Sequence, residues 1–174
     1  MTRPRHTLLP VAATLVLLAC GEATPDASQA AKGAPAPQAT GLDPCQLLTA
    51  DEIQSRLAWR PDSARGSGYG TTGTCNHFGP GGMAQQVTLV VGQGMRAMAT
   101  SADMAAWRKE QYKGYDVGAI VEPIEGLGVP AIRNEVAGLV SIEMVVAGKL
   151  VSVGAMSQLD KVRDLAALVV PRIK

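Results

Sequence analysis

The feature that most restricts the fold is the absence of a helix-forming pattern between residues 119 and 156. The sequence there alternates short apolar segments with turn residues. Ile142, Met144 and Val146 recur at every second position, which is typical of a strand with one buried face. Parallel strands need a long crossover, usually a helix, between them. We therefore predict hairpin-linked antiparallel strands at 119–124, 131–136, 139–147 and 150–156.

The preceding part of the chain predicts a further hairpin and a loop. The sequence GPGG at 79–82 separates two strand-like segments, 74–78 and 85–91. Turn residues between two such segments favour a β-hairpin. The segment 62–73 is rich in Gly, Ser and Thr, and it predicts an exposed loop.

Three helices are expected around these strands. The first follows a capping-box sequence from Thr49 to Glu52, the second opens at 100–103, and the third spans about 157–170 with one apolar stripe. Together with the hairpins, they predict an α+β fold with an antiparallel β-sheet and helices packed on one face.

The N-terminus carries a secretion pattern. Arg3 and Arg5 precede an apolar run that ends at Ala19, directly before Cys20. The last four residues of this stretch resemble the lipobox of bacterial lipoproteins. We predict a lipoprotein signal peptide at 1–19 and lipidation of Cys20. The alternatives are an ordinary cleaved signal and a transmembrane anchor, for which the run falls short of the usual length of about 20 residues.

The remaining chain divides into a tether and one domain. Residues 20–41 contain mostly Ala, Pro, Gln, Thr and Ser, so they cannot bury enough surface to fold. Residues 42–174 have the length of one globular domain. This layout predicts a lipid-anchored protein of the bacterial cell envelope. It would face the periplasm, most simply from the outer membrane, in a Gram-negative host, and lie on the outer face of the plasma membrane in a Gram-positive one.

Charge argues against nucleic acid as a partner. Loss of Arg3 and Arg5 with the signal peptide leaves 14 basic and 15 acidic residues. A nearly neutral chain without a basic run lacks the electrostatic footprint of a nucleic-acid-binding protein. The expected partners are the membrane, through the N-terminal lipid, and an envelope protein or polymer.

After Cys20, two cysteines remain, and an even pair in an oxidising compartment predicts a disulfide between Cys45 and Cys75. The alternatives are a metal site and a thiol nucleophile. Zinc sites need more Cys and His at short spacing, and His77 is the one histidine of the mature chain. We expect a single domain stapled by a structural disulfide.

No catalytic, cofactor or metal site is predicted. The Gly-x-Gly-x-x-Gly match at 68–73 follows a predicted loop and precedes a strand, whereas phosphate binding needs a strand before it and a helix after it. His77 is expected on a hairpin strand in a structural or surface role. No Gly-x-Ser-x-Gly nucleophile elbow is present.

Four features of the domain, taken together, form a pattern: DPCQLLT at 43–49, a second cysteine at Cys75, EGLG at 125–128 before a strand, and a terminal helix rich in Leu and Ala. Together they resemble an uncharacterised family of cell-envelope lipoproteins that is common in actinobacteria. Its relatives tend to carry acidic residues after the Gly-Leu-Gly, where this chain has Val129 and Pro130. The resemblance implies the lipid anchor, the Cys45–Cys75 bridge and an α+β domain. It implies no activity.

These observations lead to three functional hypotheses. The first is a non-enzymatic binding domain that engages its partner through the loops at 62–73 and 79–82. The second, by analogy of location and size, is an envelope inhibitor or an immunity protein against a toxin or hydrolase. The third and weakest is an enzyme that uses Ser, His77 or carboxylates.

Overall fold

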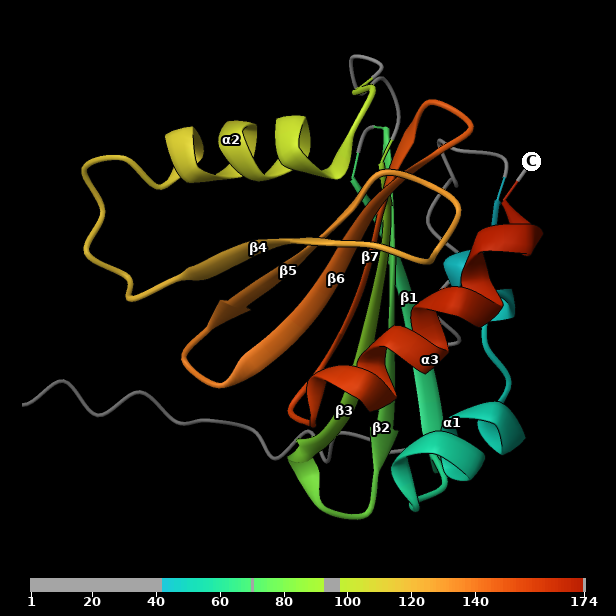
Figure 1. Cartoon of the computed structure of the whole chain (residues 1–174). Helices are drawn as coiled ribbons and strands as arrows, with labels where there is room; N and C mark the ends of the chain where they lie inside the picture. The colour runs from blue at the N-terminus through green and yellow to red at the C-terminus, as the bar shows by residue number, and fades with distance from the viewer. Residues whose placement is uncertain (1–41, 70, 93–97, 174) are drawn as a thin grey trace, which may run out of the picture. The chain divides into compact units, whose positions relative to one another are not determined.

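The computed structural model describes residues 42–69, 71–92 and 98–173 (Figure 1). Within these ranges the chain forms three α-helices, two short 3-10 helices and one seven-stranded antiparallel sheet. The helices are α1 (Ala50–Leu57), α2 (Ser101–Gln111), α3 (Leu159–Val169), η1 (Pro44–Gln46) and η2 (Val170–Arg172). The strands are β1 (Ser63–Tyr69), β2 (Thr72–Gly79), β3 (Gly82–Gly92), β4 (Ile120–Ile124), β5 (Ala131–Val136), β6 (Leu139–Val146) and β7 (Lys149–Ala155). The predicted α+β class with an antiparallel sheet is confirmed.

The sheet is built from two meanders that meet in its middle. Its strand order is β1-β2-β3-β7-β6-β5-β4. After β3 the chain passes through α2 to the far edge and returns strand by strand to β7, which pairs antiparallel with β3. Two of the returning hairpins close on Ala-Gly pairs, 137–138 and 147–148, with positive φ at both residues. Such two-residue turns match the twist of antiparallel strands. Strands β1 and β4 are therefore the two edges.

Helices cover both faces of the sheet, and this corrects the expectation that all of them pack on one face. Met144 and Val145 are neighbours on β6, so their side chains point to opposite faces. Met144 belongs to the main core cluster with Leu165 of α3, whereas Val145 packs in a second cluster with Met104 of α2. Figure 1 shows α2 over β4 and β5, well away from α3. The spacing of Met104 and Trp107 predicts a helix here, but it carries no information about which face of the sheet the helix covers.

The predicted loop at 62–73 is also corrected, because most of it forms β1. Strand β1 pairs in continuous register with β2, from Ser63 opposite Phe78 to Tyr69 opposite Thr72. Glycine is depleted in strands, and β1 contains Gly66 and Gly68, so the sequence favours a turn. Backbone pairing with β2 makes this segment a strand despite its composition.

The predicted starts of two helices, α1 and α2, are confirmed. Thr49 and Glu52 form the predicted capping box of α1, and Thr100 forms the equivalent pair with Asp103 at α2. Helix α3 begins at Leu159 without a side-chain cap from Gln158. Its stability comes instead from the fully buried Val162 and Leu165.

The chain end is tied to α1 through an ion pair. The guanidinium of Arg172 donates to both carboxylate oxygens of Glu52, with Nη1 2.9 Å from Oε2, and also to the carbonyl oxygen of Leu47. Hydrogen bonding to Arg172 is the main cause that lowers the pKa of Glu52 to about 2.

Replacement of Glu52 by glutamine tests this tie, because glutamine keeps the capping box and removes the charge. A carboxyl whose pKa is lowered on folding stabilises the protein above its unfolded pKa, and that stabilisation is lost as the pH falls towards the folded value. We expect Glu52→Gln to lower the free energy of unfolding by about 2 kcal/mol at pH 7, a value discounted for partial exposure. Between pH 4.5 and pH 2 the difference should shrink to near zero in urea titrations. A difference that stays constant over this range would contradict the assignment.

Candidate functional site

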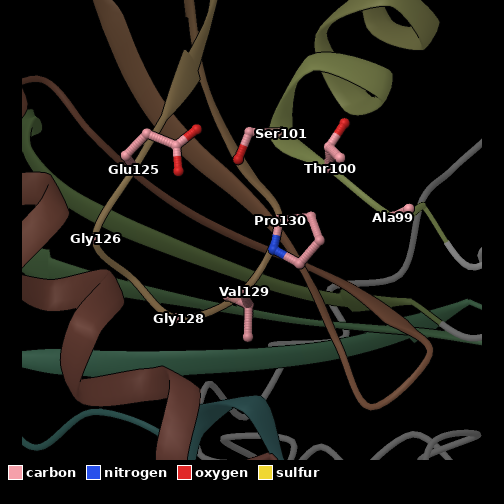
Figure 2. A pocket seen from close by; sticks show the side chains of 8 residues that line it. All are labelled: Ala99, Thr100, Ser101, Glu125, Gly126, Gly128, Val129 and Pro130. Atoms are coloured by element: carbon pink, nitrogen blue, oxygen red, sulfur yellow. The ribbon is translucent and has the colours of Figure 1, made fainter.

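One hollow among the described residues lies between the start of α2 and the β4–β5 loop (Figure 2). Its volume is about 510 Å³. Figure 2 shows Thr100 and Ser101 on one side and Glu125 on the other. Ser101 Oγ donates to the carbonyl of Ile124 and accepts from the amide of Ala131, and Thr100 Oγ1 caps α2. Both hydroxyls are thus engaged in holding the fold. The lining offers one carboxylate and no nucleophile paired with a base.

A second hollow, of about 330 Å³, lies beside the disulfide. Its walls come from the start of β1, from His77 of β2, and from the segment that leads into α1. Cys45 and Cys75 are bonded, with their Cα atoms 5.1 Å apart, so the predicted disulfide is confirmed. Across the β1–β2 ladder, His77 lies opposite Ala64, whose short side chain leaves room next to the imidazole.

His77 is buried, with 4% of its surface exposed. Its Nε2 lies 3.6 Å from Cys75 Sγ. Burial lowers the pKa of His77, so the ring is neutral at physiological pH. The structure thus places His77 on a hairpin strand, as expected, and gives it one sulfur neighbour. It brings no serine and carboxylate together with this ring by any hydrogen bond in the described part of the chain.

A polar cluster joins α2 to the sheet. Arg108 donates to the carboxylate of Glu143 on β6, and Asn134 of β5 donates to the same carboxylate over 2.7 Å. Asn134 also hydrogen-bonds to the hydroxyl of Tyr112, and the Arg108 guanidinium lies 4.6 Å from the centre of the Trp107 ring. The Glu143 side chain is 6% exposed. The cluster orients α2, and none of its residues lines either of the two hollows described. We therefore assign it a structural role.

The two edges of the sheet differ in their protection. Edge strands present unpaired backbone groups, and proteins commonly block them with proline, charge or a covering element. Strand β4 is five residues long, contains Pro123 beside Glu122, and is packed against α2. Strand β1 is seven residues long, contains no proline, and carries Arg65 as its one charged residue. Its residues from Ser63 to Ser67 are all exposed. Among the described residues, the β1 edge is therefore the less protected of the two.

The remaining features predicted from the sequence lie away from these hollows and from the polar cluster. Cys20, the signal peptide at 1–19 and the tether at 20–41 lie outside the described residues, which begin at Leu42. The Gly-x-Gly-x-x-Gly match overlaps the end of β1 and the start of β2, so no helix follows it. The turn at 79–82 links β2 to β3 as predicted.

Neither the Arg108–Glu143 pair nor the β1 edge is among the features predicted from the sequence. A glutamate at an inward-facing position of β6 signals the first, because it interrupts an apolar strand. The second had no signal in the sequence, since strand order decides which strand is an edge.

Comparison with protein-family models, curated protein sequences and solved structures gives no match. Among the described residues, no helix has the length and apolar character needed to cross a bilayer. The same part of the chain contains no cluster of His, Cys, Asp and Glu side chains arranged to hold a metal ion.

Proposed function

We propose that this chain is a lipid-anchored binding protein of the bacterial cell envelope, and that its domain takes up an extended segment of a partner protein along the β1 edge. The single observation that supports this site is the exposed edge of β1, which no described element covers, in a sheet whose other edge is packed against α2. The N-terminal pattern that ends at Cys20 supports the anchor.

An added strand is the occupant that best fits this surface. In strand addition, backbone hydrogen bonds supply affinity, and hollows beside alternate positions supply selectivity. Ala64 and Gly66 have little or no side chain, so one face of β1 projects little above the backbone. The hollow of about 330 Å³ opens beside Ala64 on this face. On the other side, Arg65 lies over the Phe78 ring, 5.8 Å from its centre, which presents a flat cationic and aromatic surface. Side chains of the added segment would therefore meet a hollow on one face of β1 and a cationic and aromatic surface on the other.

This proposal retains part of the predicted binding region at 62–73 and changes its nature from a loop to a strand edge. It also favours a protein partner over an envelope polymer, because a polysaccharide has no backbone amides to continue a β-ladder. The turn at 79–82 lies next to the start of β1, since Asp62 N donates to the carbonyl of Phe78 over 2.8 Å. The turn can therefore contact the end of the same added segment.

Paired proline substitutions test the site. Ala64 and Ser67 are three residues apart in an uninterrupted register, so the N–H of one bonds to β2 and the N–H of the other points outward. We expect the outward-facing proline to leave the urea midpoint of the full-length protein unchanged and to weaken partner capture from a native envelope extract by about tenfold or more. The inward-facing proline should lower the midpoint.

Ser67→Thr serves as a control, because threonine keeps the N–H and suits a strand. It should retain capture. If the stable proline variant captures the same proteins as the unmodified chain, the β1 proposal is wrong. If the captured species is a second copy of this chain, the partner is the chain itself. An enzyme captured in an inactive state would make the protein an inhibitor that works through this edge.

A further inference from the structure

We infer that the Cys45–Cys75 disulfide is a site of thiol–disulfide exchange, in which an external thiol attacks Cys45 and His77 stabilises the departing Cys75 sulfur. This inference concerns the hollow beside the disulfide and does not depend on the β1 proposal. It adds a chemical role to a bond that the sequence predicts as purely structural.

Access to the two sulfurs is unequal. Cys45 is half-buried and forms part of the wall of the hollow, whereas Cys75 has no exposed surface. Gly66 lies opposite Cys75 in the β1–β2 ladder, and a Cβ atom added at Gly66 would lie 3.4 Å from Cys45 Sγ. The missing side chain therefore leaves space beside Cys45. A small thiol that enters the hollow meets Cys45 first.

The buried sulfur has a partner that can stabilise it as a thiolate. His77 Nε2 lies 3.6 Å from Cys75 Sγ. In the tautomer that carries its proton on Nε2, the ring donates a hydrogen bond to the sulfur. A thiolate accepts such a bond more strongly than a disulfide sulfur does, because bonds to charged groups are stronger. Exchange is faster when the leaving thiolate is stabilised.

The reaction balances with thiols as the reductant. A thiolate RS⁻ attacks Cys45 Sγ, an RS–S bond forms, the Cys45–Cys75 bond breaks, and its electron pair remains on Cys75 as a thiolate that takes a proton from water. A second thiol then attacks the mixed disulfide, releases RSSR and leaves Cys45 as a thiol. Two thiols have lost two electrons and the protein disulfide has gained them. The substrate class is thus a small thiol or an exposed protein dithiol.

Reduced glutathione is the probe, applied to the oxidised full-length protein in native buffer. The reaction is quenched with N-ethylmaleimide, and peptide mass spectrometry locates the glutathione and the maleimide. We expect glutathione on Cys45 and maleimide on Cys75. His77→Gln should slow the first step by about fivefold, because it weakens stabilisation of the leaving sulfur. Gly66→Ala should slow it as well, because its methyl group lies against Cys45 Sγ.

Gly92→Ala is the matched control, since a Cβ there finds ordinary contacts at 3.7 and 3.8 Å, to Thr72 Oγ1 and the Leu150 carbonyl oxygen. It should leave the rate unchanged. A purely structural role of His77 predicts the opposite sign, because a less stable variant opens more often and is reduced faster. The inference is overturned if His77→Gln accelerates reduction, if glutathione appears on Cys75, or if the rate follows global unfolding across low urea concentrations.

Discussion

Replacement of both Cys45 and Cys75 by alanine is expected to lower the free energy of unfolding by about 3–4 kcal/mol. The bond links residues 30 positions apart, and it restricts the unfolded chain by closing that loop. It also holds η1 against the start of the sheet, where η1 contacts β1, β2 and β3. Urea denaturation of the oxidised protein and the double variant, followed by circular dichroism, measures the difference.

The double substitution removes both the bond and the packing of the two sulfur atoms. Cys75 has no exposed surface, so a serine there would bury an unpaired hydroxyl, whereas alanine adds no polar group. The oxidised protein treated with reductant under denaturing conditions and then refolded supplies the control, since it lacks the bond and keeps the sulfurs. A loss below about 1 kcal/mol would contradict the chain-entropy account of this bond.

Arg108→Met is expected to lower the free energy of unfolding by about 3 kcal/mol, the second largest effect. The substitution leaves the Glu143 carboxylate buried with Asn134 as its remaining hydrogen-bond donor. The side chains of Glu143 and Arg108 are only 6% and 18% exposed, so water replaces the lost guanidinium poorly. Methionine keeps most of the aliphatic packing, so the effect measures the charge.

A double variant and an exposed pair complete this test. Arg108→Met combined with Glu143→Gln removes both charges and should recover most of the loss. Lys113→Met breaks the Lys113–Glu110 pair, whose side chains are 75% and 67% exposed, and should change stability by less than about 0.5 kcal/mol. If Arg108→Met were no more destabilising than Lys113→Met, the buried pair would not orient α2 as described.

Local patterns in the sequence predicted much of this fold. The alternation of Ile142, Met144 and Val146 predicts β6, and the break between the strands expected at 139–147 and 150–156 predicts where the chain reverses. The Thr49–Glu52 capping box predicted the start of α1. Each of these signals acts over a few residues, so the sequence contains it directly.

The features that were predicted wrongly depend on contacts between segments that are distant in the sequence. Strand β1 has glycines where a strand usually has branched residues, and pairing with β2 stabilises it. The face that α2 covers depends on a crossover from the middle of the sheet to its edge. The candidate sites have the same origin: an edge strand and a hollow beside Cys45 exist only once the strand order is fixed. The anchoring of the chain through Cys20 stays a prediction.

Amide hydrogen exchange of the full-length protein, with and without its captured partner, is the most direct test of binding at the β1 edge. We expect binding to slow exchange at alternate residues from Ser63 to Tyr69, because those amides point outward in the free protein and are hydrogen-bonded in the complex. Exchange in β4, at the opposite edge, should stay unchanged. Protection that appears on other elements and leaves β1 as in the free protein would contradict the proposed function.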